Sequence, residues 1–192
     1  EILFERRINP EMLPYLEKKA HKNGFAIFTY HDDTLLTDSP NNEHIRTEAK
    51  LNNLKIIKEE DFSIAIDFAP CKCMLVSDDE EALTGLEEHW KRRLNGTLDV
   101  FRSEPYFLEV VPCGIDKANT LGVLLSHLNI TREEVIAIGD GVCDVNMLQI
   151  AGLGVAMGHS QDSVKVCADY VTASNEEDGV APVSYTHLTL PT

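Results

Sequence analysis

Basic residues are scarce in this chain of 192 residues: Lys and Arg number 17, against 32 Asp and Glu, for a net charge of −15. Binding to nucleic acid or to an anionic membrane surface depends on clustered Lys and Arg, so this balance argues against both. Long apolar runs are also missing, since no stretch approaches the ~20 consecutive apolar residues of a membrane-spanning helix. We therefore expect neither a nucleic-acid nor a membrane partner.

Paired cysteines are absent as well. The five cysteines are an odd number and contain no Cys-x-x-Cys motif, which argues against a disulfide scaffold and a zinc ribbon. Free thiols fit a reducing compartment, so a cytoplasmic location is expected. The chain has no signal peptide and no initiator Met, and residues 1–7 begin within a pattern, so we expect it to be a fragment.

An apolar fraction of 43% is typical of a globular protein, and the length fits one or two domains. The clearest helix of the first half covers residues 78–94, where Leu83, Leu86 and Trp90 recur at helical spacing. Basic residues 91–93 at its end match the helix macrodipole. The other elements expected there are helices at 10–22 and 43–53, and strands at 25–30, 63–68, 73–76, 98–102 and 106–111.

The second half alternates strands and helices more regularly. Its expected helices cover 116–128, 144–150 and 161–167, and its expected strands cover 135–138, 154–157 and 170–172. Such alternation predicts a parallel sheet with right-handed crossovers, and so an α/β fold. Catalytic residues are then expected at the carboxyl ends of the strands.

Two aspartates stand at such an end. Asp140 directly follows the apolar strand at 135–138 and lies between Gly139 and Gly141, while Asp144 can return to the same place from the next helix. Two converging carboxylates suit Mg²⁺, a hard cation that takes oxygen ligands and keeps waters. A tight turn capped by Asp144 would have the same spacing, and the spacing alone does not separate the two hypotheses.

Lys117 and His159 are further candidates. Lys117 opens a helix after a strand and a turn, where its charge opposes the macrodipole and would stabilise a phosphoryl group. An ordinary exposed Lys accounts for the same position. His159 follows Gly158 at the end of a strand, but no second His lies nearby in sequence, so a surface role is favoured over a metal site.

The ordered motifs carry a family resemblance. The segments 112–117 (PCGIDK), 139–144 (GDGVCD) and 152–158 (GLGVAMG), followed by 168–172 and 175–181, resemble the haloacid dehalogenase-like phosphatases of the Cof-type, sugar-phosphate branch. The resemblance covers residues 1–181 and is close after Tyr106. It implies that residues 1–105 form an α+β cap domain. Residues 106–181 would form the C-terminal half of a doubly wound, parallel, Rossmann-like core.

The resemblance also implies a function, the Mg²⁺-dependent hydrolysis of small phosphorylated metabolites through an aspartyl-phosphate. By match, Asp140 and Asp144 are the expected metal residues, with Asp144 supporting the metal shell and orienting Lys117. Lys117 and Asp144 are the expected catalytic residues, because Lys117 would neutralise charge at nucleophile and phosphate. Lys117 and Cys143 are expected to bind substrate. The family usually has Asn at the position of Cys143, and a thiol is a weaker hydrogen-bonding group.

Two segments depart from the family pattern. The nucleophile motif, an apolar strand ending in Asp-x-Asp-Gly-Thr, is not found and is expected before Glu1, so the chain alone is expected to be inactive. Asp32 and Asp33 are a possible substitute, but adjacent side chains alternate in direction, and a polar cap loop is preferred. Residues 182–192 lack helical periodicity and are interpreted as a non-native tail, with a divergent natural tail as the alternative.

Two other functions stay open. One is a non-catalytic binding or regulatory module that kept the fold without the chemistry, which Cys143 favours slightly. The other is a phosphomutase, which would share every site residue found here.

Overall fold

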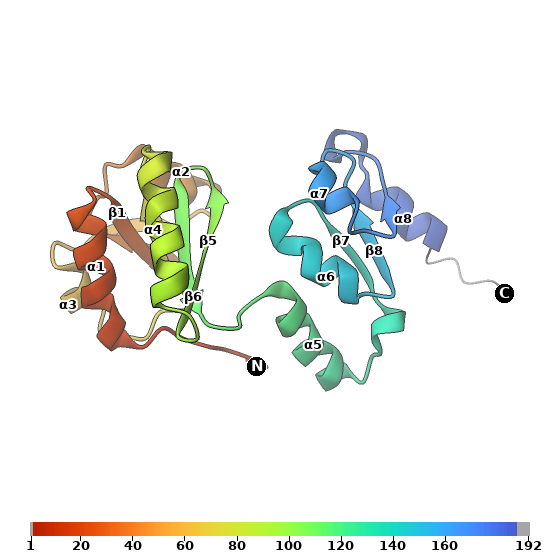
Figure 1. Cartoon of the computed structure of the whole chain (residues 1–192), viewed down its shortest axis with the longest axis horizontal. Coiled ribbons are helices and arrows are strands. Elements are labelled where there is room, and N and C mark those ends of the chain that lie inside the picture. Colours follow the sequence, from red (N-terminus) through yellow and green to blue (C-terminus); the bar gives the residue numbers. More distant parts are fainter. Residues whose placement is uncertain (1, 188–192) are drawn as a thin grey trace. The chain divides into compact units, whose positions relative to one another are not determined.

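The computed structural model describes residues 2–187, which divide into two compact units (Figure 1). One unit is residues 5–115, and the other is residues 116–187 together with residues 2–4. Within residues 2–187, no helix is both long enough and apolar enough to cross a membrane.

The unit of residues 5–115 is built on a six-stranded sheet in the order β3-β2-β1-β4-β6-β5. Neighbouring strands are antiparallel, except for β2 and β3, which are parallel. The strands are β1 (Ala26–His31), β2 (Thr34–Thr37), β3 (Lys55–Lys58), β4 (Cys73–Val76), β5 (Leu98–Glu104) and β6 (Phe107–Pro112). The helices are η1 (Pro10–Met12), α1 (Leu13–Lys22), α2 (Glu43–Leu51), α3 (Phe62–Ala65) and α4 (Glu80–Arg93).

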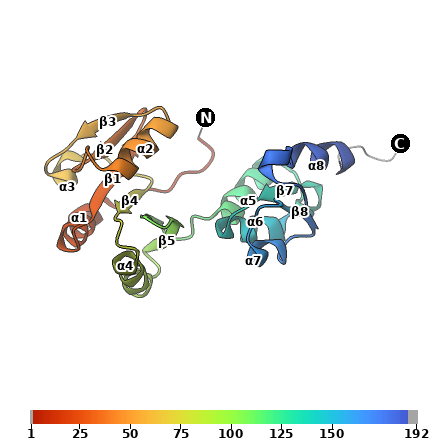
Figure 2. The same ribbon diagram turned by 90° about the horizontal axis from the view of Figure 1, so that it is seen from above.

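Both faces of this sheet are covered. Because side chains alternate along a strand, Ile27 packs with the apolar residues of α1 and α4, whereas Phe28 packs with Ile45 and Ala49 of α2. Figure 2 shows α1 and α4 on one side of the sheet and α2 on the other. The sheet therefore separates two apolar clusters.

Local signals place most of these elements where the sequence predicts them. The Asn9 side chain accepts a hydrogen bond from the Glu11 amide (3.1 Å) at the start of the first helix, and Asp79 accepts one from the Ala82 amide (2.9 Å) at the start of α4. The strand expected at residues 63–68 is wrong, because α3 forms there instead. Apolar and polar residues alternate only weakly in this segment. The helical turn is favoured instead by the burial of Phe62 and by a hydrogen bond from the Ala65 amide to the Asp61 carbonyl (2.9 Å).

The division between the units also differs from the expected boundary at 105/106. Strand β6 pairs with both β4 and β5, with Val110 opposite Cys73 and Val100, so it belongs to the six-stranded sheet. The first unit therefore extends to Ile115.

The unit of residues 116–187 contains a three-stranded parallel sheet, as the alternating pattern predicts. Its order is β7-β8-β9, formed by Ile136–Gly139, Leu153–Ala156 and Tyr170–Val171. Helix α6 packs on β7 and β8, and α5 packs against α6. The helices are α5 (Lys117–Leu128), η2 (Arg132–Glu134), η3 (Val142–Asp144), α6 (Val145–Ile150), α7 (Asp162–Lys165), η4 (Asn175–Glu177) and α8 (Val180–His187).

The last helix corrects one expectation. Residues 182–187 were expected to be non-helical, yet α8 runs through them and buries Val183 to 1% exposure. Pro182 lies in the first turn, where a proline removes no intrahelical hydrogen bond, so it does not stop the helix. The rest of the expected tail, residues 188–192, lies outside the described residues.

Candidate active site

The carboxyl edge of the three-stranded sheet gathers the polar residues that the motifs singled out. Asp140 follows β7, and His159 follows β8 by a short loop. The first residue of α5, Lys117, reaches the same place, because α5 packs against η3. All four expected site residues, Lys117, Asp140, Cys143 and Asp144, are thus brought together within one unit.

Asp144 is the centre of this arrangement. Its side chain is buried (5% exposed), and its Oδ1 accepts a hydrogen bond from the ammonium group of Lys117. Its Oδ2 accepts from the backbone amides of Asp140 (3.0 Å) and Gly141 (3.0 Å). A buried carboxylate must be paired and hydrogen-bonded, and here three donors satisfy it.

The glycine before Asp140 is required by this packing. A Cβ on Gly139 would lie 2.5 Å from the Cβ of Asp144 and 2.8 Å from its Oδ2. A Cβ does not approach non-bonded atoms this closely without displacing them, so glycine is what lets the strand end and the carboxylate lie this close together.

Both members of the pair are charged at neutral pH. Burial alone raises the pKa of Asp144, but the hydrogen bonds from Lys117, Gly141 and Asp140 outweigh it, so the pKa lies below its ordinary value. The hydrogen bond to Asp144 raises the pKa of Lys117, against the smaller effect of burial. The result is a permanent ammonium group held in a fixed place while its side chain remains 55% exposed.

Asp140 is arranged differently from Asp144. Its side chain is 60% exposed, and its Oδ2 lies 3.3 Å from Nε2 of His159. Mg²⁺ takes carboxylate oxygens, waters and phosphate oxygens, so an exposed carboxylate at a sheet edge fits it as one ligand. Asp144 fits a supporting role better than direct coordination, because all three of its donors are already aimed at its oxygens.

Within residues 2–187, no three His, Cys, Asp or Glu side chains cluster closely enough to hold a metal by themselves. A magnesium ion held by Asp140 would therefore complete its shell mainly with waters and with the oxygens of a bound phosphate.

Cys143 lies in η3 and is exposed, with its Sγ 4.0 Å from Oδ1 of Asp144. It is close enough to Lys117 to contribute to the raised pKa of that residue. The thiol thus stands beside the ion pair, but it offers a phosphate only a weak hydrogen bond.

Asp32 and Asp33 do not belong to the unit that holds this arrangement. They form the turn of the β1–β2 hairpin in the unit of residues 5–115, where Asp32 adopts φ +48°. That is the polar loop that the adjacency of the two aspartates favours.

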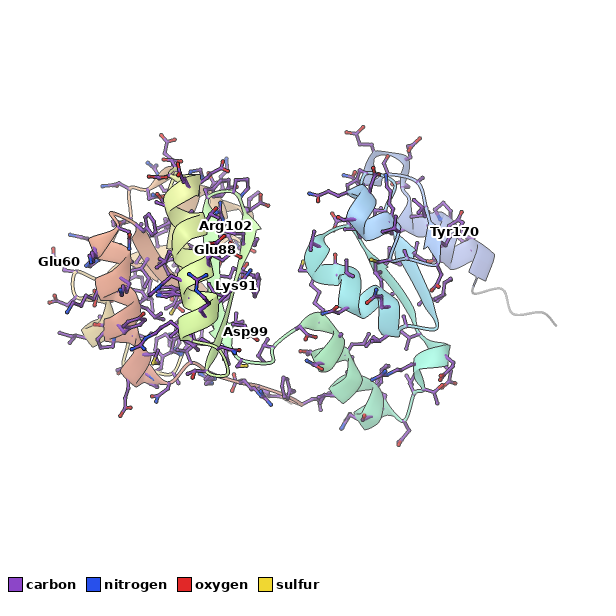
Figure 3. The ribbon with its side chains drawn as sticks, in the orientation of Figure 1. Glu60, Glu88, Lys91, Asp99, Arg102 and Tyr170 are labelled. Carbon is purple, nitrogen blue, oxygen red and sulfur yellow. The ribbon has the colours of Figure 1, made fainter. Side chains whose placement is uncertain are left out.

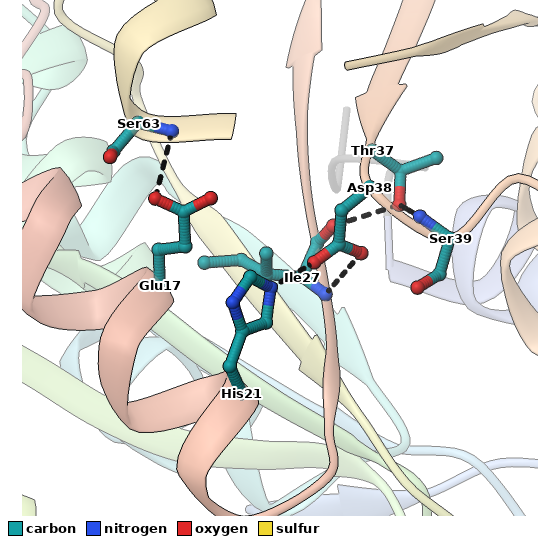
Figure 4. A network of polar contacts seen from close by, with 7 residues as sticks. All are labelled: Glu17, His21, Ile27, Thr37, Asp38, Ser39 and Ser63. Atoms are coloured by element: carbon teal, nitrogen blue, oxygen red, sulfur yellow. Dashed lines mark hydrogen bonds and ion pairs between the residues drawn. The ribbon is translucent and has the colours of Figure 1, made fainter. Parts of the chain in front are cut away.

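A cleft of about 600 Å³ lies in the unit of residues 5–115. His21 binds Asp38 there (Nε2 to Oδ2, 2.6 Å), and Asp38 also accepts from the Ile27 amide (Figure 4). The lining of the cleft includes Asp38, Glu60, Asp78 and Asp79 but neither Lys nor Arg. Four carboxylates repel a phosphate, so the phosphate site is better sought at Lys117.

His159, for which a surface role was favoured, contacts Asp140, and its second partner was not predicted from the sequence. The amide of Asn175 donates to Nδ1 of His159 (3.3 Å). The useful signal was the place of His159 directly after a strand and a glycine, on the same sheet edge as Asp140.

Comparisons with known proteins agree with the motifs. A family model described as haloacid dehalogenase-like hydrolase matches residues 1–183. A 5-amino-6-(5-phospho-D-ribitylamino)uracil phosphatase of Bacillus subtilis is 45% identical over 106 residues, which are 55% of this chain and 41% of that protein. The chain therefore spans less than half the length of that curated relative.

Solved structures show the same fold. A haloacid dehalogenase-like hydrolase from Bacteroides thetaiotaomicron is 45% identical, with a TM-score of 0.88 over 95% of this chain and 68% of that one. A sugar phosphatase of subclass IIB is 25% identical, with a TM-score of 0.81 over 99% of this chain and 71% of that one. The chain belongs to the haloacid dehalogenase-like hydrolases, in their Cof-type subfamily IIB.

Proposed function

We propose that this chain carries the magnesium and phosphate site of a phosphatase for small phosphorylated metabolites. The observation that carries the proposal is the Lys117 ammonium group, fixed by the buried carboxylate of Asp144 beside the exposed carboxylate of Asp140. The fixed cation can bind a phosphate dianion, and the exposed carboxylate beside it can bind the metal counterion of that phosphate.

Lys117 binds the phosphate in this scheme. Its ammonium group has three donors, of which Asp144 takes one, so two remain to reach the oxygens of a phosphate. The amides of Asp140 and Gly141 do not serve the phosphate, because both donate to Asp144. Cys143 adds at most a weak contact at the rim. Asp144 is therefore a positioning residue, and Lys117 is the residue that touches the substrate.

Asp140 would hold the magnesium ion. When bound there, Mg²⁺ supplies positive charge that lowers the repulsion between the phosphate and an attacking group. The exposure of Asp140 is what makes its carboxylate available for this role.

The two units take complementary parts in this proposal. Residues 116–181 serve as the C-terminal half of a doubly wound core. Residues 5–115, in place of the expected 1–105, serve as the α+β cap that selects the substrate.

The family resemblance implies an aspartyl-phosphate intermediate, for which a third carboxylate is needed. The motif that would supply it, an apolar strand ending in Asp-x-Asp-Gly-Thr, is not found in the sequence, so we expect the chain by itself to hydrolyse no phosphate ester.

Calorimetric titration with inorganic phosphate in the presence of Mg²⁺ tests the site. Lys117→Met should weaken binding at least about tenfold, because a hydrogen bond to a charged group contributes about 1.5–3 kcal/mol. Lys165→Met in the same unit is the matched control and should bind like the wild type. Equal affinities for the wild type and Lys117→Met would remove the basis of the proposal.

Turnover is measured separately with p-nitrophenyl phosphate and Mg²⁺. We expect none from this chain. Mg²⁺-dependent turnover that disappears in Asp140→Ala would contradict that expectation and direct attention to Asp32 and Asp33 as nucleophiles.

A non-catalytic phosphate-binding module is the second candidate, favoured by the thiol of Cys143 at the rim of the ion pair. The coding sequence before Glu1 separates the two functions. An in-frame strand ending in Asp-x-Asp supports the enzyme, whereas a native start at this point supports the module.

A further inference from the structure

His159 lies between a carboxylate and a backbone amide at the carboxyl edge of the three-stranded sheet. Its Nε2 is 3.3 Å from Oδ2 of Asp140, and its Nδ1 is 3.3 Å from the amide nitrogen of Asn175. One imidazole ring, carried by the loop after β8, thus joins the end of β7 to the segment that follows β9.

The two contacts determine which nitrogen carries the proton. The Asn175 amide is a donor, so Nδ1 of His159 must offer it a lone pair. A neutral ring with a lone pair on Nδ1 has its hydrogen on Nε2. That hydrogen points toward Asp140, so His159 donates to the carboxylate.

The segment that presents the Asn175 amide is itself held firmly. The Ser174 hydroxyl donates to Oε2 of Glu177 (2.8 Å), and the Gly179 amide donates to the Ser174 carbonyl (2.9 Å). The loop of His159 is joined to it by the Gly158 amide, which donates to the Ala173 carbonyl (3.0 Å). A Cβ on Gly158 would lie 2.8 Å from the Thr172 carbonyl oxygen, so the two segments are in direct contact.

We propose that His159 is a positioning residue for Asp140 and sets the affinity of this edge for a divalent cation. By donating to Oδ2, the ring limits rotation of an exposed carboxylate. Oδ1, which has no hydrogen-bond partner within the described part of the chain, is left for the cation. Partners that hydrogen-bond to a metal ligand orient it, and their loss commonly lowers metal affinity 10–100-fold. The inference rests on the proposed function, because it takes Asp140 as the cation ligand.

Binding of Mn²⁺, followed by electron paramagnetic resonance on the full chain, tests this role without turnover. His159→Phe keeps a ring but removes both nitrogens, and should weaken Mn²⁺ binding about tenfold or more. His159→Gln keeps a donor that reaches Asp140 and should stay within about threefold of the wild type. His127→Phe is the matched control, because His127 is an exposed histidine on α5, and this variant should bind Mn²⁺ like the wild type.

The tautomer is a second readout, independent of the metal. Long-range ¹⁵N NMR on the chain labelled with ¹⁵N-histidine should show the hydrogen of His159 on Nε2. In the double variant Ser174→Ala, Glu177→Ala, the fraction of rings with the hydrogen on Nε2 should fall. A hydrogen on Nδ1 in the wild type would overturn the inference, even if His159→Phe fails to fold.

The pattern of variants separates the two hypotheses. If Asp140→Asn abolishes Mn²⁺ binding while His159→Phe binds like the wild type, the positioning role is wrong and the proposed site stands. If the wild type binds no Mn²⁺, or Asp140→Asn binds as well as the wild type, the proposed function fails at its metal site and the inference falls with it.

Discussion

The two units of this chain differ in how they are held together. Among the described residues, the largest fully buried side chains all lie in residues 5–115, and they include Trp90, Phe28 and Phe62. The cluster of buried residues in residues 116–187 consists of smaller side chains, Ala137, Leu148, Ala156 and Val164. That unit also leaves large apolar residues exposed, including Leu128 (52%), Val166 (81%) and Tyr170 (44%), the last labelled in Figure 3.

The comparison separates stability from chemistry. Residues 5–115 bury both faces of a six-stranded sheet, so apolar packing holds them together. The candidate site lies in the other unit and is held by an ion pair, two amide donors and a histidine. A site built on the less buried unit is expected to open more easily and to gain stability when its ligand binds.

The largest expected effect comes from the core of residues 5–115. Phe28 is fully buried, and its ring centroid lies 5.4 Å from that of Tyr30 and 5.8 Å from that of Phe107. Phe28→Ala should lower the free energy of unfolding by about 3–5 kcal/mol. Trp90, the single tryptophan of the chain, lies in the same unit, so its fluorescence during urea unfolding reports this loss.

Ile64→Ala is the control for that variant, because Ile64 is 79% exposed. Its urea midpoint should match the wild type within about 0.5 kcal/mol. If Phe28→Ala lowers the free energy of unfolding by less than about 1 kcal/mol, apolar packing does not distinguish residues 5–115 from the other unit.

A smaller effect is expected at the site. Gly139→Ala places a methyl group 2.5 Å from the Cβ of Asp144, and the displacement should destabilise residues 116–187 by about 1–3 kcal/mol. The Trp90 transition should not move. Hydrogen exchange of β7 and β8 measures the change, with Gly122→Ala as the matched control, since a Cβ there meets nothing within 4 Å.

Gly122 lies within α5, where alanine is favoured over glycine, so its variant should exchange as slowly as the wild type or more slowly. If the amides of Gly139→Ala also exchange like those of the wild type, the position of Asp144 does not depend on its close approach to Gly139 at the end of β7.

The smallest effect concerns pH. The pKa of Asp144 is lower in the folded chain than its ordinary value of 3.8, so its contribution to stability is present above pH 3.8. That contribution is lost as the pH falls through the lower, folded pKa. The protection of the β7 amides, taken relative to the intrinsic exchange rate at each pH, should therefore fall below pH 3.8 in the wild type. Asp144→Asn should remove this acid dependence, and an unchanged dependence would show that Asp144 is not the group responsible.

Local signals account for much of the fold that could be predicted. Asn9, Asp79 and Asp116 each cap a helix through a side-chain oxygen, and short polar side chains before apolar periodicity announce such caps. In residues 116–187, each strand and helix expected from the alternation is present, because glycines, caps and apolar runs agree there.

Elements that depend on distant partners were harder to predict. Strands β2 and β3 are four residues each, and Lys55 and Lys58 give β3 little apolar character, so pairing across the sheet decides their structure. The membership of β6 depends likewise on its partners β4 and β5 rather than on its own sequence.

The site divides in the same way. Asp140 and Asp144 were indicated by their short separation along the chain after a strand, and Lys117 by its place at the start of a helix that follows a strand and a turn. The contact between His159 and the Asn175 amide was not predictable, because it depends on how two loops meet after β8 and β9. Residue types and spacing carry no information about a backbone donor of that kind.

Hydrogen exchange of the full chain, with and without Mg²⁺ and inorganic phosphate, tests most directly whether Lys117 and Asp140 form a phosphate site. We expect slower exchange in residues 117–121 and 139–145 when both are added, no change in residues 5–115, and no protection in Lys117→Met. Protection confined to the acidic cleft around Asp38 and Asp78, or none at residues 139–145, would contradict it.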